Sequence, residues 1–123
     1  MAARLTSREW SARSGAPDAV AHWLLRYALA ADYLGRRPEF RDAHLRAAWA
    51  ATEGGALLLG GAVGDPPMEA LLLFTARAAA EAFAATDPYV LHGLVTGWRV
   101  MPWATVVGAE AANPVHPRDT KLA

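Results

Sequence analysis

The hydrophobic positions of this chain change their period along the sequence, and the changes mark successive helices and strands. In residues 19–29 apolar side chains occupy alternate positions, which predicts a strand with one strongly apolar face. In residues 38–55 they recur at helical spacing, and the segment opens with Pro38, which suits the first turn of a helix. The glycine pair 54–55 suits the end of that helix. Residues 31–37 are expected to form the loop between the two elements.

The following segments predict two further strands, a second helix and a last strand. Continuous apolar runs at 56–63 and 68–75 flank turn residues and predict a β-hairpin whose middle is buried on both faces. The alanine-rich segment 76–86 has high helix propensity and must end before Pro88, because the residue preceding a proline resists the α-helical region. Valine and tryptophan are frequent in 94–108, which predicts a long strand.

The order strand, helix, strand, strand, helix, strand predicts an α+β fold. It is the ferredoxin-like βαββαβ arrangement, an antiparallel sheet with both helices on one face. We expect residues 1–18 to be an extension that is flexible in part, 19–108 to form the domain, and 109–123 to be a tail. Two helices cover one sheet face only, while the central strands are apolar on both. A second copy of the chain is the simplest cover for the other face, which predicts a homodimer.

Composition narrows the classes of protein and of site. The chain has 123 residues, 54% of them hydrophobic and 20% charged, so we expect one folded domain rather than a disordered chain. A formal net charge of zero argues against a nucleic-acid or anionic-membrane partner. Without cysteine there is no disulfide and no thiolate metal site. The apolar runs are too short to span a bilayer and no secretory signal pattern is present, so a cytoplasmic location is expected.

Four short motifs resemble the YciI-like (YCII-related) family of the dimeric α/β-barrel superfamily, over roughly residues 20–108. In chain order they are "RDAHLRAAW", "GGALLLGGAV", "DPYVLHGLV" and "WRVMPW". No single motif is strong, but their order and spacing agree with the predicted elements. The resemblance implies that His44 and Asp87 are the paired functional positions, and that Arg41 matches an arginine three residues before the histidine.

His44 and Asp87 each have a structural alternative. A lone histidine beside an apolar stripe is commonly half-buried and held by a backbone carbonyl, whereas the family match favours a proton-transfer role that imidazole performs near neutral pH. Asp87 before Pro88 is typical of an N-cap followed by a first helical turn. The preceding helix end disfavours a carboxylate, so a nearby imidazolium would compensate it. Capping and catalysis are compatible, because a carboxylate has two oxygens.

Three further residues are candidates for substrate binding. Arg41 lies on the same side of the predicted helix as His44 and could hold an anionic group, although a solvated surface arginine fits equally well. His92 fits an exposed loop, or the mouth of a pocket. Trp103 lies five residues after Trp98, so the two occupy opposite strand faces unless a bulge at Pro102 resets the phase; one would then face the helices and the other the dimer interface or pocket.

Two other expectations concern the core and metals. Trp49 shares a helical stripe with Leu45, Ala48 and Thr52, so we expect it in the core rather than in a substrate platform. The four histidines are scattered without ligand spacing, so no metal site is predicted.

The resemblance implies a small-molecule lyase or isomerase. His44 would be the general base or acid, and Asp87 would orient it or act as the second acid or base. The substrate would be a small cyclic carbonyl or phenolic compound, in a setting that includes specialised metabolism, and no cofactor is required. The alternative is a non-catalytic ligand-binding or accessory dimer of the same fold, in which the pair is structural. A haem- or oxygen-using member of the superfamily is disfavoured, because no histidine has a recognisable axial-ligand context.

Overall fold

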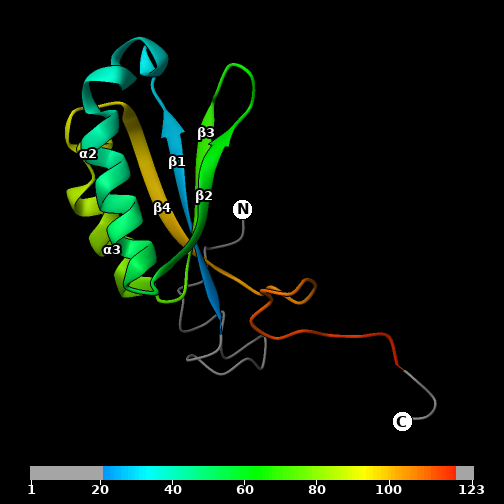
Figure 1. Cartoon of the computed structure of the whole chain (residues 1–123). Coiled ribbons are helices and arrows are strands. Elements are labelled where there is room, and N and C mark those ends of the chain that lie inside the picture. The colour runs from blue at the N-terminus through cyan, green and yellow to red at the C-terminus, as the bar shows by residue number, and fades with distance from the viewer. Residues whose placement is uncertain (1–20, 119–123) are drawn as a thin grey trace, which may run out of the picture.

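An antiparallel four-stranded sheet with helices on one face forms the domain (Figure 1). The computed structural model describes residues 21–118, so the predicted extension 1–18 and the end of the predicted tail lie outside the described residues. The elements in chain order are β1 (His22–Leu29), α2 (Tyr33–Glu53), β2 (Leu57–Val63), β3 (Glu69–Phe74), α3 (Arg77–Thr86), α4 (Pro88–Leu91) and β4 (Val95–Trp103). The sheet order is β2-β3-β1-β4, and all neighbours are antiparallel. The predicted ferredoxin-like βαββαβ fold is confirmed.

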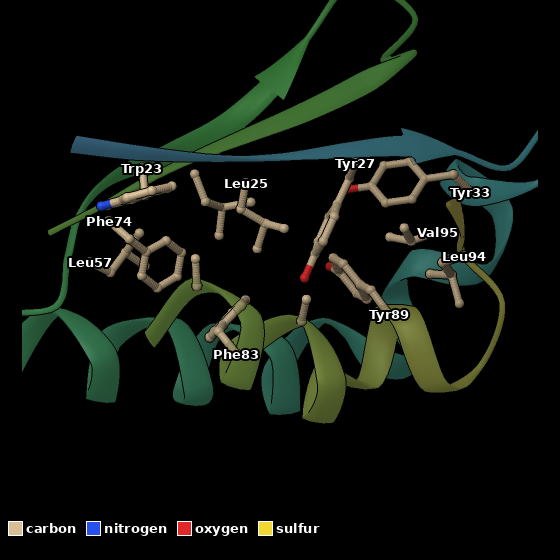
Figure 2. Packing of buried hydrophobic residues seen from close by; sticks show 13 residues of the cluster. Trp23, Leu25, Tyr27, Tyr33, Leu57, Phe74, Phe83, Tyr89, Leu94 and Val95 are labelled. Carbon is tan, nitrogen blue, oxygen red and sulfur yellow. The ribbon is translucent and has the colours of Figure 1, made fainter. Parts of the chain in front are cut away.

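The alternating pattern of β1 builds the centre of the core. Trp23, Leu25 and Tyr27 are buried and point from β1 toward the helices (Figure 2). Phe83 of α3 is buried beneath the same face and lies 5.6 Å, ring centre to ring centre, from Phe74 of β3. The strand pattern therefore decides which sheet face the helices cover.

The first helix begins earlier than the sequence predicts. It starts at Tyr33, so the expected loop at 31–37 is largely helical, and Pro38 lies inside the helix. Pro38 lacks the N–H that would bond to the carbonyl of Leu34. Leu34 is exposed, so water can satisfy that carbonyl, and burial of Tyr33 gives the early turn a tertiary anchor. The end is as predicted: Glu53 is the last helical residue, and Gly55 follows with a left-handed φ of 84°.

The apolar stripe of α2 packs against the core only in part: Ala48 does, but Trp49 does not, contrary to expectation. Trp49 is 64% exposed and Leu45 is also exposed. Both line a cavity between the middle of α2 and the sheet, because the facing part of β2 carries Gly60 and Ala62 rather than large side chains. The helical period was interpreted correctly, but period alone does not say whether the opposite surface reaches the stripe.

The last strand is an edge strand, as the proline in it predicts. β4 pairs only with β1, and Pro102 lies opposite Trp23 in an unbroken register. The register shift lies between Ala28 and Leu29 instead, so Trp98 and Trp103 occupy opposite faces. The strand ends at Trp103, shorter than the predicted 94–108.

The segment after β4 turns back on itself instead of continuing the strand. The N–H groups of Asn113 and Val115 donate to the carbonyls of Thr105 and Val106. The Thr105 hydroxyl also lies 2.7 Å from Nδ1 of buried His22 and accepts from the N–H of Ala112. These local bonds compete with strand pairing beyond Trp103 and anchor the segment to the start of β1.

The sheet face opposite the helices is mainly apolar and half-buried. By register, Leu24 of β1, Leu71 and Leu73 of β3 and Met101 of β4 share this face. Arg26 and Glu69 form an ion pair on it. Figure 1 shows that none of the helices of residues 21–118 covers this side. Within residues 21–118, no helix is long and apolar enough to cross a membrane.

The buried centre of β1 gives a direct test of this core. Leu25 is 0% exposed, whereas Leu91 of α4 is 64% exposed. Leu25→Ala should lower the free energy of unfolding by about 2–5 kcal/mol, because it leaves a cavity in packed surroundings. The control Leu91→Ala should change it by only about 0.5 kcal/mol. Chemical denaturation measures both, and equal losses would contradict the assigned core.

Candidate active site

The cavity lies between α2 and the β2–β3 side of the sheet and has a volume of ≈ 470 Å³. That volume falls in the range of small-molecule sites. Its apolar wall includes Leu45, Trp49 and Leu72. Its ionisable lining residues are Tyr27, Tyr33, Arg37, Arg41, His44 and Tyr89. The cavity is thus largely aromatic and aliphatic, with a few polar groups gathered from β1, α2 and α4.

Asp87 lies between α3 and α4 and is completely buried, at 0% exposed. Its Oδ1 accepts the N–H of Tyr89 at 3.0 Å, which is the predicted N-cap of the short helix α4. The same oxygen lies 2.8 Å from Nδ1 of His44. Its Oδ2 accepts the hydroxyl of Tyr27 at 2.7 Å. Three groups from three elements therefore compensate the buried carboxylate.

His44 forms the predicted contact with Asp87, although 43 positions separate them. An ionised carboxylate only accepts hydrogen bonds, so Nδ1 carries the hydrogen and Nε2 is the free ring nitrogen. The imidazole stacks on the Tyr89 ring at 3.9 Å with an interplanar angle of 9°. The side chain is 15% exposed and lines the cavity. No described residue bonds to Nε2, and no buried polar side-chain atom in residues 21–118 lacks a partner, so Nε2 is accessible.

The two tyrosines nearest Asp87 and His44 are held in their protonated form. Burial raises the pKa of Tyr27 far above its ordinary 10.0, and the Asp87 charge and hydrogen bond raise it further. Burial also raises the pKa of Tyr89 to about 12 and outweighs the opposing effect of Arg41 and Arg37. Both hydroxyls therefore stay neutral hydrogen-bond donors at physiological pH.

The structure brings together some of the predicted site residues and not others. Arg41 lines the cavity with His44. His92 does not line it: its ring stacks on Phe40 at 4.4 Å, and its carbonyl accepts from the Arg36 guanidinium. Trp103 does not line it either, because it lies opposite His22 on the sheet face away from the helices. Neither His92 nor Trp103 is therefore placed to contact a ligand in this cavity.

Tyr27, Tyr89 and Arg37 were missed from the sequence. Tyr27 was interpreted only as an apolar residue of β1, yet a buried tyrosine hydroxyl needs a hydrogen-bond partner, which is a usable signal. Tyr89 follows the cap residue by two positions, where its N–H meets the Asp87 carboxylate. Arg37 lay in the segment that was expected to be a loop. Among the described residues, no three metal-binding side chains lie together.

Comparisons with known proteins give a fold but no family. No protein-family model matches the chain, and no curated protein matches its sequence. The structure is similar to 5-chloro-2-hydroxyhydroquinone dehydrochlorinase (TftG) from Burkholderia phenoliruptrix, in complex with 2,5-dihydroxybenzoquinone. The TM-score is 0.57 at 20% identity, covering 68% of this chain and 94% of that one. This likeness supports the predicted fold class, the ferredoxin-like fold of dimeric α/β-barrel proteins.

A second similar structure is too remote to carry an argument. It is named as an antibiotic biosynthesis monooxygenase from Bacteriodes thetaiotaomicron, with a TM-score of 0.46 at 14% identity, covering 72% of this chain and 91% of that one. The resemblance to the YciI-like family accordingly stays a prediction.

The raised tyrosine pKa values predict a loss of stability in alkali. Below pH 10 both phenols are protonated in the folded and unfolded chain, so their contribution is fully present. Above the unfolded pKa of 10.0 the unfolded phenols lose protons while the folded ones retain them, and the free energy of unfolding falls. For Tyr89 the fall continues to about pH 12. Chemical denaturation on either side of pH 10 measures it, and Tyr89→Phe should make the fall shallower. Phenolate absorbance from all three tyrosines of an intact fold near pH 10 would contradict the prediction.

Proposed function

We propose that this chain is a small-molecule lyase or isomerase in which His44 transfers a proton. The observation that carries the proposal is the 2.8 Å contact between His44 Nδ1 and Asp87 Oδ1 at the wall of a cavity. With Nδ1 occupied, Nε2 is the nitrogen available to a bound molecule. The cavity wall around His44 is largely apolar with a few polar groups, and this environment suits a general base or acid.

Asp87 acts through His44 rather than on the substrate. It is fully buried, and both of its oxygens already accept hydrogen bonds. It fixes the imidazole tautomer and stabilises the imidazolium that forms when Nε2 takes a proton. The same division of roles operates in Ser-His-Asp triads, where the aspartate does not itself become protonated. Of the two roles considered for Asp87, orienting His44 is the one that this geometry favours.

The proposed step balances with the groups present. Nε2 takes a proton from a carbon next to a carbonyl; the C–H bond breaks, an N–H bond forms, and the electron pair becomes an enolate. Where a C=C bond is conjugated with the enolate, return of the proton to the far end of that bond shifts the double bond and completes an isomerisation. Alternatively, the enolate re-forms the carbonyl, a C=C bond forms between the carbon that lost the proton and its neighbour, and the bond from that neighbour to a leaving group breaks; the leaving group departs with the electron pair, and the imidazolium gives up its proton to that group. In either case His44 is regenerated, and no further reactant is required.

The proposed substrate is a small cyclic carbonyl or phenolic compound. Three tyrosines and Trp49 line the cavity, and its size suits a ring with a few substituents. The dehydrochlorinase with the similar fold acts on a hydroxyhydroquinone and holds a dihydroxybenzoquinone. At 20% identity the likeness is one of fold, and it suggests which compounds to assay first.

Substitution of Asp87 separates this proposal from a binding protein with a structural pair. Asp87→Asn can keep one oxygen on both the α4 cap and His44 Nδ1, with its amide NH2 toward the Tyr27 hydroxyl, but it removes the negative charge that stabilises the imidazolium. Proton transfer should fall roughly 10²–10⁴-fold, as for His44→Gln. The assay is exchange of solvent deuterium into cyclic ketones and polyhydroxybenzenes, followed by NMR. His116→Gln, an exposed histidine outside the cavity, is the control.

Thermal unfolding of the same variants distinguishes the catalytic proposal from a binding protein with a structural pair. The proposal expects Asp87→Asn to leave thermal unfolding nearly unchanged. A loss of about 1–3 kcal/mol, the cost of a disturbed buried partner, together with unchanged exchange per folded molecule would defeat the catalytic proposal and favour the binding protein.

We also propose that two copies associate through the sheet face opposite the helices. Leu24, Leu71, Leu73 and Met101 form an apolar surface there, and no helix in the described part of the chain covers it. Matching faces of two copies would bury these side chains around the Arg26–Glu69 pair.

Sedimentation tests this assembly. The unaltered chain should sediment at micromolar concentration with twice its mass of 13.1 kDa. Leu71→Lys should shift it toward the monomer, because burial of a lysine in an apolar interface is costly. Leu91→Lys, on the exposed side of α4, should leave the dimer intact. A monomer from the unaltered chain would rule out the proposed assembly.

A further inference from the structure

The ionisable wall of the cavity carries positive charge, and no Asp or Glu of residues 21–118 lines it. Arg37, which is half-buried, and Arg41, which is exposed, line it from successive turns of α2. The Arg and carboxylate ion pairs within residues 21–118 join Arg26 to Glu69 and Arg77 to Glu81. Neither cavity arginine therefore has a carboxylate within 4.0 Å in the described part of the chain. Two guanidinium groups without a carboxylate partner, beside a largely apolar cavity, can together hold a planar anion.

Two tyrosines line the cavity beside these arginines. The rings of Tyr89 and Tyr33 meet edge to face at 5.6 Å. The Arg37 guanidinium lies 5.7 Å from the centre of the Tyr33 ring. The charges of Arg41 and Arg37 oppose the rise in the pKa of Tyr89 that its burial causes. Because burial keeps that phenol protonated, it can donate a hydrogen bond but cannot neutralise the arginines.

We propose that the cavity takes its substrate as a planar organic anion whose charged oxygen is bound by Arg37 and Arg41. This inference rests on the proposed proton transfer for its chemistry, but the anion site stands on its own geometry. Arg41 precedes His44 by three residues on the same helix face, about 4.5 Å along the axis. A six-membered ring can therefore place an anionic oxygen at the guanidinium groups while another ring atom meets Nε2 of His44. The Tyr89 ring stacks on His44 and meets the Tyr33 ring edge to face.

The chemical class follows from shape and charge together. A ring hydroxyl conjugated through a double bond to a carbonyl is as acidic as a carboxylic acid and is ionised at neutral pH, and a ring carboxylate carries the same charge. Both present a planar, negatively charged oxygen group, which the guanidinium fork matches. The arginines would also stabilise the enolate charge that develops when His44 removes a proton, in a cavity where water does not screen it fully.

Matched pairs of probes isolate the charge from the ring. Cyclohexane-1,3-dione is an anion at neutral pH, and its methyl enol ether has the same ring but cannot ionise. Benzoate and benzamide form the second pair. Binding is measured by calorimetry at low and high salt, on the unaltered chain, on the double variant Arg37→Gln/Arg41→Gln, and on Arg46→Gln. Arg46 is an exposed arginine of α2 that does not line the cavity. Glutamine retains helix propensity, and thermal unfolding checks that each variant is folded.

The unaltered chain should bind the anion of at least one pair more tightly than its neutral counterpart. The double variant should bind that anion with at least tenfold lower affinity, because the charge-assisted hydrogen bonds are lost. The remaining affinity should no longer depend on salt. The affinity for the neutral probe should change less than threefold. Arg46→Gln should bind like the unaltered chain. Which anion binds more tightly tells whether the charged oxygen is an enolate or a carboxylate.

Three results would overturn the inference: no measurable binding of either anion, equal binding of anion and neutral probe, or anion binding unaffected in the double variant. Binding requires no turnover, so the result is independent of the proton-transfer assay. His44→Gln should lower exchange roughly 10²–10⁴-fold and bind the anion like the unaltered chain. An unaltered chain that binds the anion through its arginines but shows no exchange would mean that the proposed function has failed. Exchange without arginine-dependent anion binding would mean that the present inference has failed.

Discussion

The buried carboxylate of Asp87 is the point on which the site depends. It joins β1 through Tyr27, α2 through His44 and α4 through the backbone of Tyr89. An isolated charge in this position would be strongly unfavourable, and removing any one donor would leave part of that cost uncompensated. The bonds to Tyr27 and His44 join α2 to β1 through one carboxylate at the level of the cavity. The geometry of the proposed chemistry therefore depends on this one group.

The fold could be predicted from local patterns, because the spacing of apolar residues in a segment indicates the type of element and its apolar face. The alternation in β1 identified Trp23, Leu25 and Tyr27 as the buried face, and the order of elements then left few topologies. The start of α2 was not predictable, since the burial of Tyr33 outweighs the preference of a proline such as Pro38 for the first turn of a helix. The exposed Trp49 could not be foreseen either, because the helical period does not show that small residues of β2 lie opposite it.

The candidate site was accessible from the sequence only through resemblance. No spacing rule connects His44 to Asp87, because the contact requires the sheet and both helices to be in place. Spacing did predict correctly that Asp87 caps α4. It gave no indication that Tyr27 would share the carboxylate, or that His92 would stack on Phe40 away from the cavity. Such tertiary contacts depend on strand register and on the placement of the helices. Neither can be inferred from a short segment of the sequence.

The small residues of β2 have a consequence for how stability and occupancy are related. Where a larger side chain would meet α2, Gly60 and Ala62 leave space, so the hydrophobic core is incomplete beside Leu45 and Trp49. If the proposed substrate occupies that space, it supplies the missing contacts and binds the folded chain only. Occupancy then raises the melting temperature by mass action. Such a ligand would be a removable part of the core, and the packing of the domain would be complete only with the ligand bound.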